Sequence, residues 1–251
     1  MSGHSKWASI KHKKGALDAK RGKIFTRHAK LIEIAAREGG GGDIRMNPSL
    51  ATAIENAKAD NVPNANIERA VKKGTGELKG EQTSAVTFEA YGPGGAAVVI
   101  ECLTDNKNRT LSNVKSAIER HGGKWAGSGS VMWMFEQKGI SIGSSQDAKL
   151  LSSEEAELEL IDAGAEDVEK KEKMIAVTSS AQNCAKVRDV LRRQGWDIEE
   201  SGLKLIAKQE TVISDSDTAK KITAFIAAIE EDEDVSAVHT NTSVSDTVIL
   251  H

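Results

Sequence analysis

Lysine and arginine side chains are concentrated at the start of the chain, where their chemistry would be the neutralisation of phosphate. The first thirty residues hold nine of these cations against one acid, Asp18, although the whole chain of 251 residues has a formal net charge of −3. Cations that pair with phosphates release condensed counterions, which supplies most sequence-independent affinity for nucleic acid. The pattern predicts a nucleic-acid-binding segment, with a solvated basic tail as the alternative. The nine cations are Lys6, Lys11, Lys13, Lys14, Lys20, Arg21, Lys23, Arg27 and Lys30.

Basic residues further along the chain extend the candidate interface. Lys72 and Lys73 lie in the last turn of a predicted helix, where complementing the helix dipole is the structural alternative. Lys107 and Arg109 belong to a polar loop before another predicted helix, whose N-terminal amides can bind an anion. The glycines of the hairpin tip at residues 91–95 permit close backbone approach to a ligand, although a purely structural turn explains them as well.

Catalytic and metal-binding patterns are weak in this sequence. The six histidines are scattered, and the two cysteines, Cys102 and Cys184, form no metal or redox motif. The glycine clusters at residues 92–95 and 127–130 lack the GxxxxGK[ST] order of a phosphate-binding loop. Acidic runs such as residues 230–234 look like solvated helix ends. We therefore expect no enzyme, no cofactor, no metal and no small-molecule substrate.

The chain has no apolar run approaching the roughly 20 residues that a membrane span requires. Its basic N-terminus lacks the apolar stretch of a secretory signal, although a mitochondrial transit peptide is harder to exclude. Two isolated cysteines fit buried structural thiols in a reducing compartment. We expect a cytoplasmic protein without a membrane partner.

Charge and periodicity separate an N-terminal part from the remainder. Residues 1–80 carry sixteen Lys/Arg against eight Asp/Glu, and residues 81–251 carry eighteen against twenty-nine. Apolar residues at helical spacing predict a helix over residues 23–37 that ends at four glycines, a second helix after Pro48, and a third from Asn64 or Asn66 to Gly74. Residues 1–80 are thus predicted to form a basic arm and a small helical bundle.

From residue 81 the pattern changes to strands that alternate with helices. The segment 138–206 follows a strand–helix–strand–strand–helix–strand order, the βαββαβ order of a ferredoxin-like domain. Residues 81–137 would join residues 207–251 in a second such domain, into which the first is inserted. The fold class is therefore predicted as α+β with three domains. The expected strands cover residues 86–91, 96–104, 130–135, 139–143, 166–170, 174–178, 203–207, 209–213 and 236–240. The expected helices cover residues 110–121, 153–163 and 182–194, and a last helix is capped by Asp215 or Asp217 and runs to about residue 230.

Long motifs distributed over nearly the whole chain carry a family resemblance. They include SGHSKW at residues 2–7, IKHKK at 10–14, RGKIFTR at 21–27, NP at 47–48, NIERA at 66–70, KKGTG at 72–76, YGPGG at 91–95, ECLTDN at 101–106, NRT at 108–110, GSV at 129–131 and WMF at 133–135. In these motifs the chain resembles the YebC/PmpR family, which includes the mitochondrial translational activator of cytochrome c oxidase.

The resemblance implies a helical N-terminal domain and two ferredoxin-like domains, one inserted in the other. It also implies a DNA-binding transcriptional regulatory protein, and it brings no catalytic residues. A second role associated with the family is a ribosome-associated translation factor that contacts rRNA or tRNA and relieves stalled synthesis, for example at proline runs.

The residues themselves leave the target open. Base discrimination in duplex DNA normally comes from a helix or ribbon in the major groove, yet no predicted helix has an Arg/Asn/Gln-rich face. A lysine-rich arm suits an RNA surface at least as well, since such segments often order on binding. Ferredoxin-like domains also bind small molecules or each other, so a ligand sensor or assembly module is a third class.

The arm hypothesis generates a first prediction. Reversing the charge of Lys11, Lys13 and Lys14 should lower affinity for nucleic acid and flatten its salt dependence by about 0.7–0.9 log units per lost phosphate contact. Binding titrations at several salt concentrations would measure this slope, and an unchanged slope would exclude the arm from the interface.

Overall fold

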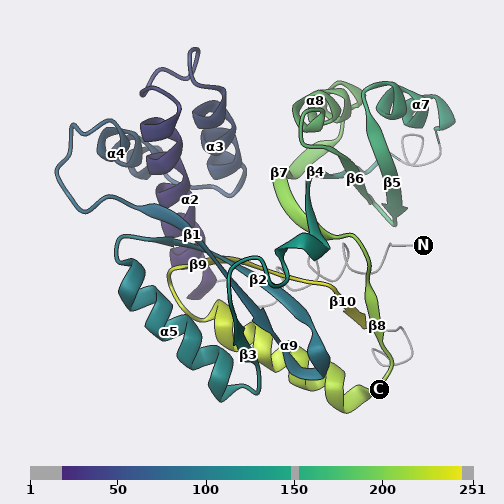
Figure 1. Cartoon of the computed structure of the whole chain (residues 1–251). Coiled ribbons are helices and arrows are strands. Elements are labelled where there is room, and N and C mark those ends of the chain that lie inside the picture. The colour runs from purple at the N-terminus through teal and green to yellow at the C-terminus, as the bar shows by residue number, and fades with distance from the viewer. Residues whose placement is uncertain (1–18, 148–152, 245–251) are drawn as a thin grey trace. The chain divides into compact units, whose positions relative to one another are not determined.

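The computed structural model of the protein describes residues 19–147 and 153–244 (Figure 1). Four predicted interface residues, Lys6, Lys11, Lys13 and Lys14, lie outside these ranges. Within them the chain forms an N-terminal three-helix region and then two four-stranded antiparallel sheets with helices. The predicted α+β class is confirmed at this level.

The helical region consists of α2 (Ala19–Glu38), α3 (Pro48–Ala59) and α4 (Asn64–Gly74). Buried Ile32 of α2 and Ile67 of α4 contribute to its apolar interior. The turn before α3 is held by Asn47, whose Oδ1 accepts the Leu50 amide at 3.0 Å while its Nδ2 donates to the Ala35 carbonyl at 2.8 Å. This one buried side chain therefore caps α3 and ties it to α2.

The first sheet has the strand order β3-β1-β2-β9, and all its neighbours are antiparallel. Helices α5 and α9 cover one face (Figure 1), and Ile100, Val114 and Phe225 are buried between them and the sheet. The α9 helix begins where Asp215 accepts the Thr218 amide at 2.8 Å, as an N-cap should. These elements are β1 (Ser84–Tyr91), β2 (Ala97–Thr104), α5 (Lys107–Arg120), β3 (Lys124–Ala126), α9 (Ser216–Glu230) and β9 (Val235–Thr240).

The second sheet has the strand order β5-β6-β4-β7 and its own core, which includes Leu160, Val187 and Trp196. Its elements are β4 (Phe135–Ser144), α7 (Glu154–Asp162), β5 (Ala165–Lys171), β6 (Met174–Ser180), α8 (Cys184–Gln194) and β7 (Asp197–Ala207). A separate parallel pair joins β8 (Thr211–Ile213) to β10 (Thr242–Val244). The chain divides into two compact units, residues 1–54, 62–136 and 207–251 in one and residues 55–61 and 137–206 in the other.

The structure corrects the strand expected over residues 130–135. Residues Met132–Met134 form a 3₁₀ turn, η3, and β4 begins only at Phe135. The cause is Glu89, whose carboxylate binds the amides of Val131 and Met132 and so removes them from strand pairing. Strands β3 and β10 were not expected, because three residues are too few to show an alternating pattern.

A close approach between Gly123 and Phe225 closes the core of the first sheet. A Cβ atom on Gly123 would lie 2.4 Å from Cε2 of Phe225 and 2.9 Å from the Tyr91 carbonyl oxygen. Phe225 is fully buried, so its ring has little room to move away. Glycine is required here because it leaves space for a neighbouring side chain.

We therefore predict that Gly123→Ala lowers the free energy of unfolding by about 1–3 kcal/mol through overpacking. Gly22→Ala is the matched control, because nothing lies within 4 Å of a Cβ at that helical position. The control should be neutral or up to about 1 kcal/mol more stable. Urea unfolding of both variants would measure the difference, and equal effects would contradict the packing argument.

Candidate nucleic-acid interface

Two of the predicted interface lysines, Lys23 and Lys30 of α2, face the acidic turn, residues 230–234, which connects α9 to β9. The Lys30 Nζ lies 2.7 Å from Oδ1 of Asp234 and 2.8 Å from the Leu103 carbonyl oxygen. The Lys23 Nζ donates to the carbonyl oxygens of Glu230 and Asp232. These contacts attach α2 to the first sheet and its helices.

Asp234 is the centre of this network. Its Oδ2 lies 2.8 Å from Nη2 of Arg109 and 2.8 Å from Oγ1 of Thr110, which donates a hydrogen bond to it. Burial alone would raise the pKa of Asp234, but the hydrogen bonds from Arg109, Lys30 and Thr110 outweigh burial and hold the pKa well below its usual range. The carboxylate therefore stays ionised although its side chain is only 8% exposed.

The acidic turn was expected to be a solvated helix end, and for Asp234 that expectation is wrong. Asp234 is buried because three cationic or hydroxyl side chains from α2 and α5 compensate its charge. Lys23 is partly buried against the same acidic turn. Burial lowers the pKa of its ammonium, and the negative charges of Glu230, Asp232 and Glu233 partly restore it.

Lys73 has a buried acidic partner as well. Its Nζ lies 2.9 Å from Oε2 of Glu33, and both Glu33 oxygens also accept hydrogen bonds from Thr83, one from its amide and one from its hydroxyl. Arg37 donates to the Thr83 carbonyl oxygen at 2.7 Å. Three side chains from α2 and α4 thus fix the backbone just before β1.

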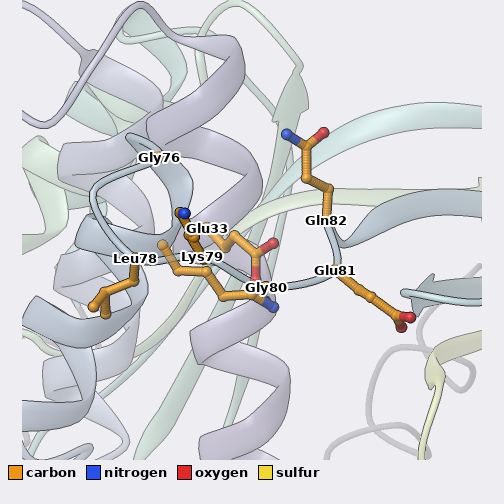
Figure 2. A pocket seen from close by; sticks show the side chains of 8 residues that line it. Glu33, Gly76, Leu78, Lys79, Gly80, Glu81 and Gln82 are labelled. Carbon is orange, nitrogen blue, oxygen red and sulfur yellow. Dashed lines mark ion pairs between the residues drawn. The ribbon is translucent and has the colours of Figure 1, made fainter.

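A pocket of about 240 Å³ lies beside this ion pair, where the segment between α4 and β1 turns (Figure 2). Its one buried carboxylate, Glu33, already binds Thr83 and Lys73, so the pocket offers no unused buried charge to a ligand. We therefore interpret the pocket as a result of how this segment packs, and we do not assign it a ligand. Its lining residues are Glu33, Lys73, Gly76, Leu78, Lys79, Gly80, Glu81 and Gln82.

The glycine–serine loop, residues 127–132, is organised by the buried Glu89 of β1. The Glu89 carboxylate accepts the amides of Gly129, Val131 and Met132, the last two at 2.7 Å and 2.9 Å. Burial would raise the pKa of Glu89, but these backbone hydrogen bonds lower it below its ordinary value. The amides that a phosphate would need are therefore bound by the protein's own carboxylate.

The hairpin tip at residues 91–95 has a clear structural role. It contains the 3₁₀ turn η2 (Pro93–Gly95), in which Gly94 and Gly95 have φ angles of 71° and 80° that favour glycine. A Cβ on Gly94 would lie 2.9 Å from Cγ2 of Thr218 at the start of α9. This geometry supports the structural interpretation of the glycines, and a ligand contact there stays a prediction.

The remaining predicted residues occupy different settings. Lys20 and Arg21 lie on α2, and their side chains are not described. Arg27 is partly buried on the same helix, whereas Lys72 and Lys107 are exposed. Arg109 is half exposed and also pairs with Asp105 at 2.9 Å, and its amide is capped by Asn106 Oδ1 at 3.1 Å. The structure therefore gathers Lys23, Lys30 and Arg109 around the acidic turn.

Sequence reasoning missed the three buried carboxylates, Glu33, Glu89 and Asp234, that bind these groups. No local signal marks them, since Glu33 lies in an ordinary helix, Glu89 in an ordinary strand, and Asp234 among other acids. Cys102 and Cys184 are both buried and free, as expected of structural thiols, and burial raises the pKa of Cys102 to about 12.

Across residues 19–147 and 153–244, no group of three His, Cys, Asp or Glu side chains is placed to hold a metal ion. Likewise, no helix in the described ranges combines the length and apolar character needed to cross a membrane.

Almost the entire chain is similar to known proteins. Residues 5–77 match the model of the TACO1/YebC protein N-terminal domain, and residues 83–242 match the model of the TACO1/YebC second and third domain. A relative from Treponema pallidum subsp. pallidum is 44% identical over 251 residues, which is 100% of both chains. A relative from Thermotoga maritima is 45% identical over 246 residues, 98% of this chain and 95% of its own. Both are named "Probable transcriptional regulatory protein".

A solved structure supports the same relationship. The crystal structure of a conserved hypothetical protein from Aquifex aeolicus has a TM-score of 0.84 and 40% sequence identity to this chain. The similarity covers 96% of this chain and 98% of the other.

The Asp234 network generates a stability prediction. Asp234→Asn should lower the free energy of unfolding at pH 7 by about 2–3 kcal/mol, because Lys30 and Arg109 lose their shared counter-charge. Glu231→Gln is the control, since Glu231 belongs to the same turn but is exposed. Urea unfolding would measure both variants, and a similar small loss in each would contradict the central role of Asp234.

The pH dependence of that difference follows from the direction of the shift. Because the pKa of Asp234 is lower in the folded protein than in the unfolded chain, its stabilisation is present above about pH 4 and is lost as the pH falls through the folded-state pKa. The stability gap between the parent protein and Asp234→Asn should therefore shrink below about pH 4. A gap that stays constant down to pH 2 would show that the carboxylate charge is not responsible.

Proposed function

The chain belongs to the TACO1/YebC family, and from this membership we propose that it is a non-catalytic regulator of gene expression that binds nucleic acid. The observation that carries the proposal is the full-length similarity to relatives named as probable transcriptional regulatory proteins. The first form of the proposal is accordingly a cytoplasmic DNA-binding transcriptional regulator without enzymatic activity, cofactor or small-molecule substrate.

We propose that phosphate contacts come mainly from the basic arm and from exposed cations, including Lys72 and Lys107. A lysine that already pairs with a carboxylate at 2.7–2.9 Å would have to give up that partner to bind phosphate. Lys30 and Lys73 are in this position, and Lys23 and Arg109 are bound in a similar way. The four therefore act first in holding the fold, although Arg109 remains half exposed.

The proposed architecture is three domains, namely residues 1–80, residues 81–137 with 207–251, and residues 138–206 inserted between the two parts of the second. Strand order supports a ferredoxin-like fold for both sheets. In the second sheet, β4 leads through α7 to β5, and α8 leads to β7, in the order β5-β6-β4-β7. In the first sheet, β2 leads through α5 to β3, and α9 leads to β9. Strand β1 lies between β3 and β2, just as β6 lies between β5 and β4 in the second sheet.

A second form of the proposal is a ribosome-associated factor that contacts rRNA or tRNA. One structural observation favours it over sequence-specific reading of duplex DNA. Helix α2 carries the most basic stripe in the helical region, yet Lys23 and Lys30 are bound to the acidic turn. The helix is therefore poorly placed to present these side chains to base edges in a major groove. A lysine-rich arm that contacts phosphates needs no such helix.

Ultraviolet crosslinking of the intact protein in cells, followed by sequencing of the attached nucleic acid, distinguishes the two forms. We expect discrete promoter DNA if the protein regulates transcription, and rRNA or tRNA if it acts on the ribosome. The variant with Lys11, Lys13 and Lys14 replaced by Glu should recover less of either, because it weakens phosphate contacts. Recovery of no nucleic acid above a non-binding control protein would refute both forms.

A further inference from the structure

Trp133 is unusual among the large apolar side chains because it is 66% exposed, yet it is held in place. It lies in the 3₁₀ turn η3, and its Nε1–H donates a hydrogen bond to the Ser130 carbonyl oxygen at 3.0 Å. The hydroxyl of Tyr91, which is 39% exposed, lies 3.4 Å from the same oxygen. The polar atoms of both aromatic side chains thus point to one backbone group, which leaves their rings as the exposed surface.

The backbone under these rings is firmly anchored. Glu89 lies two residues before Tyr91 on β1. Its carboxylate accepts the amides of Val131, which precedes η3, and of Met132, the first residue of η3. Glu89 is only 5% exposed, and backbone hydrogen bonds compensate its charge. Trp133 is therefore presented on a preorganised loop, so little conformational entropy is lost when a ligand binds it.

Two lysines flank the aromatic pair. Lys124 of β3 is directly opposite Tyr91 of β1 in the antiparallel register, so the two side chains share one face of the sheet. Lys208 donates from Nζ to the Trp133 carbonyl oxygen at 2.8 Å and from its backbone amide to the Met134 carbonyl oxygen at 2.9 Å. Both lysines are exposed. We call Tyr91, Lys124, Trp133 and Lys208 the aromatic platform.

We infer that the aromatic platform binds unpaired bases of a single-stranded nucleic acid. A base stacks on the ring of Trp133, Tyr91 extends the apolar surface, and exposed Lys124 attracts the phosphates of the same strand, while Lys208 holds the Trp133 backbone in place. This inference rests on the proposed function and specifies it, because bases in a duplex are stacked on one another and do not expose a free face. The platform would therefore select single-stranded or looped segments.

A protein partner is a poorer match to the same surface. Stable protein interfaces bury about 800 Å² per partner and have an apolar centre. Among the described residues of the platform and the glycine–serine loop, only Tyr91 and Trp133 are exposed large apolar side chains. Their neighbours are lysines and the small residues at positions 127–130, a composition that suits one or two stacked bases.

The test uses the full chain and fluorescence anisotropy with a labelled oligo(U) of about 12 nucleotides, compared with an RNA duplex of equal length. Trp133→Leu should weaken binding of the single strand about tenfold and leave the duplex affinity unchanged. Trp133→Phe should retain most of the affinity, because it keeps an aromatic ring. Both variants lose the hydrogen bond to Ser130, so their difference separates stacking from a structural effect of that bond.

Leu111→Ala is the matched control, because Leu111 is 38% exposed on α5, which packs against the opposite face of the sheet. It should leave both affinities unchanged. Equal single-strand affinity for the parent protein and Trp133→Leu would overturn the platform. If the Lys11, Lys13 and Lys14 variant nevertheless bound more weakly, the proposed function would stand.

Binding of neither probe by the parent protein would instead refute nucleic-acid binding, and the inference would fall with it. Sedimentation velocity of the same variants covers the protein alternative. If Trp133→Leu abolished self-association without changing either affinity, the platform would be a contact between copies of this chain, and the inference would be wrong.

Discussion

The buried carboxylate of Asp234 is the constraint on which the N-terminal part of the structure depends. It joins Lys30 of α2 to Arg109 and Thr110 of α5, and it lies directly before β9. A buried charge is costly unless it is paired and hydrogen-bonded, so each partner must stay in position for the others to be stable. The helical region and the first sheet are thereby held together by electrostatics as well as by apolar packing.

This network divides the positive charge of the chain between two roles. Lys23, Lys30, Lys73 and Arg109 neutralise carboxylates or carbonyl oxygens within the fold. The cations of the arm, together with exposed Lys72, Lys107 and, in the aromatic platform, Lys124, are the ones that we assign to phosphate. A count of basic residues therefore overstates the nucleic-acid surface, because a lysine contributes to binding only if its ammonium is not already committed to an acid.

Two further buried carboxylates, Glu33 and Glu89, hold backbone segments in place. Glu33 fixes the backbone before β1 through Thr83, and Glu89 fixes the loop that presents Trp133. In both cases a buried acidic side chain accepts hydrogen bonds from backbone amides and so fixes the position of the backbone. The aromatic platform is thus a consequence of where Glu89 places the loop.

Local patterns in the sequence determined most elements of this protein. Helical spacing indicated α2, and the strand and helix order around α7 and α8 predicted the second sheet. The sequence offered Asp215 and Asp217 as caps of α9, and the structure shows that Asp215 is the cap. The basic arm was likewise evident from composition, because it depends on neighbouring residues alone. Only the tertiary structure decided that Lys30 binds Asp234, 204 residues further along the chain, and that Trp133 lies exposed in a 3₁₀ turn where a strand was expected. Which acid neutralises which cation depends on how elements that are distant in the sequence pack together. Residue type and local spacing carry no information about that packing.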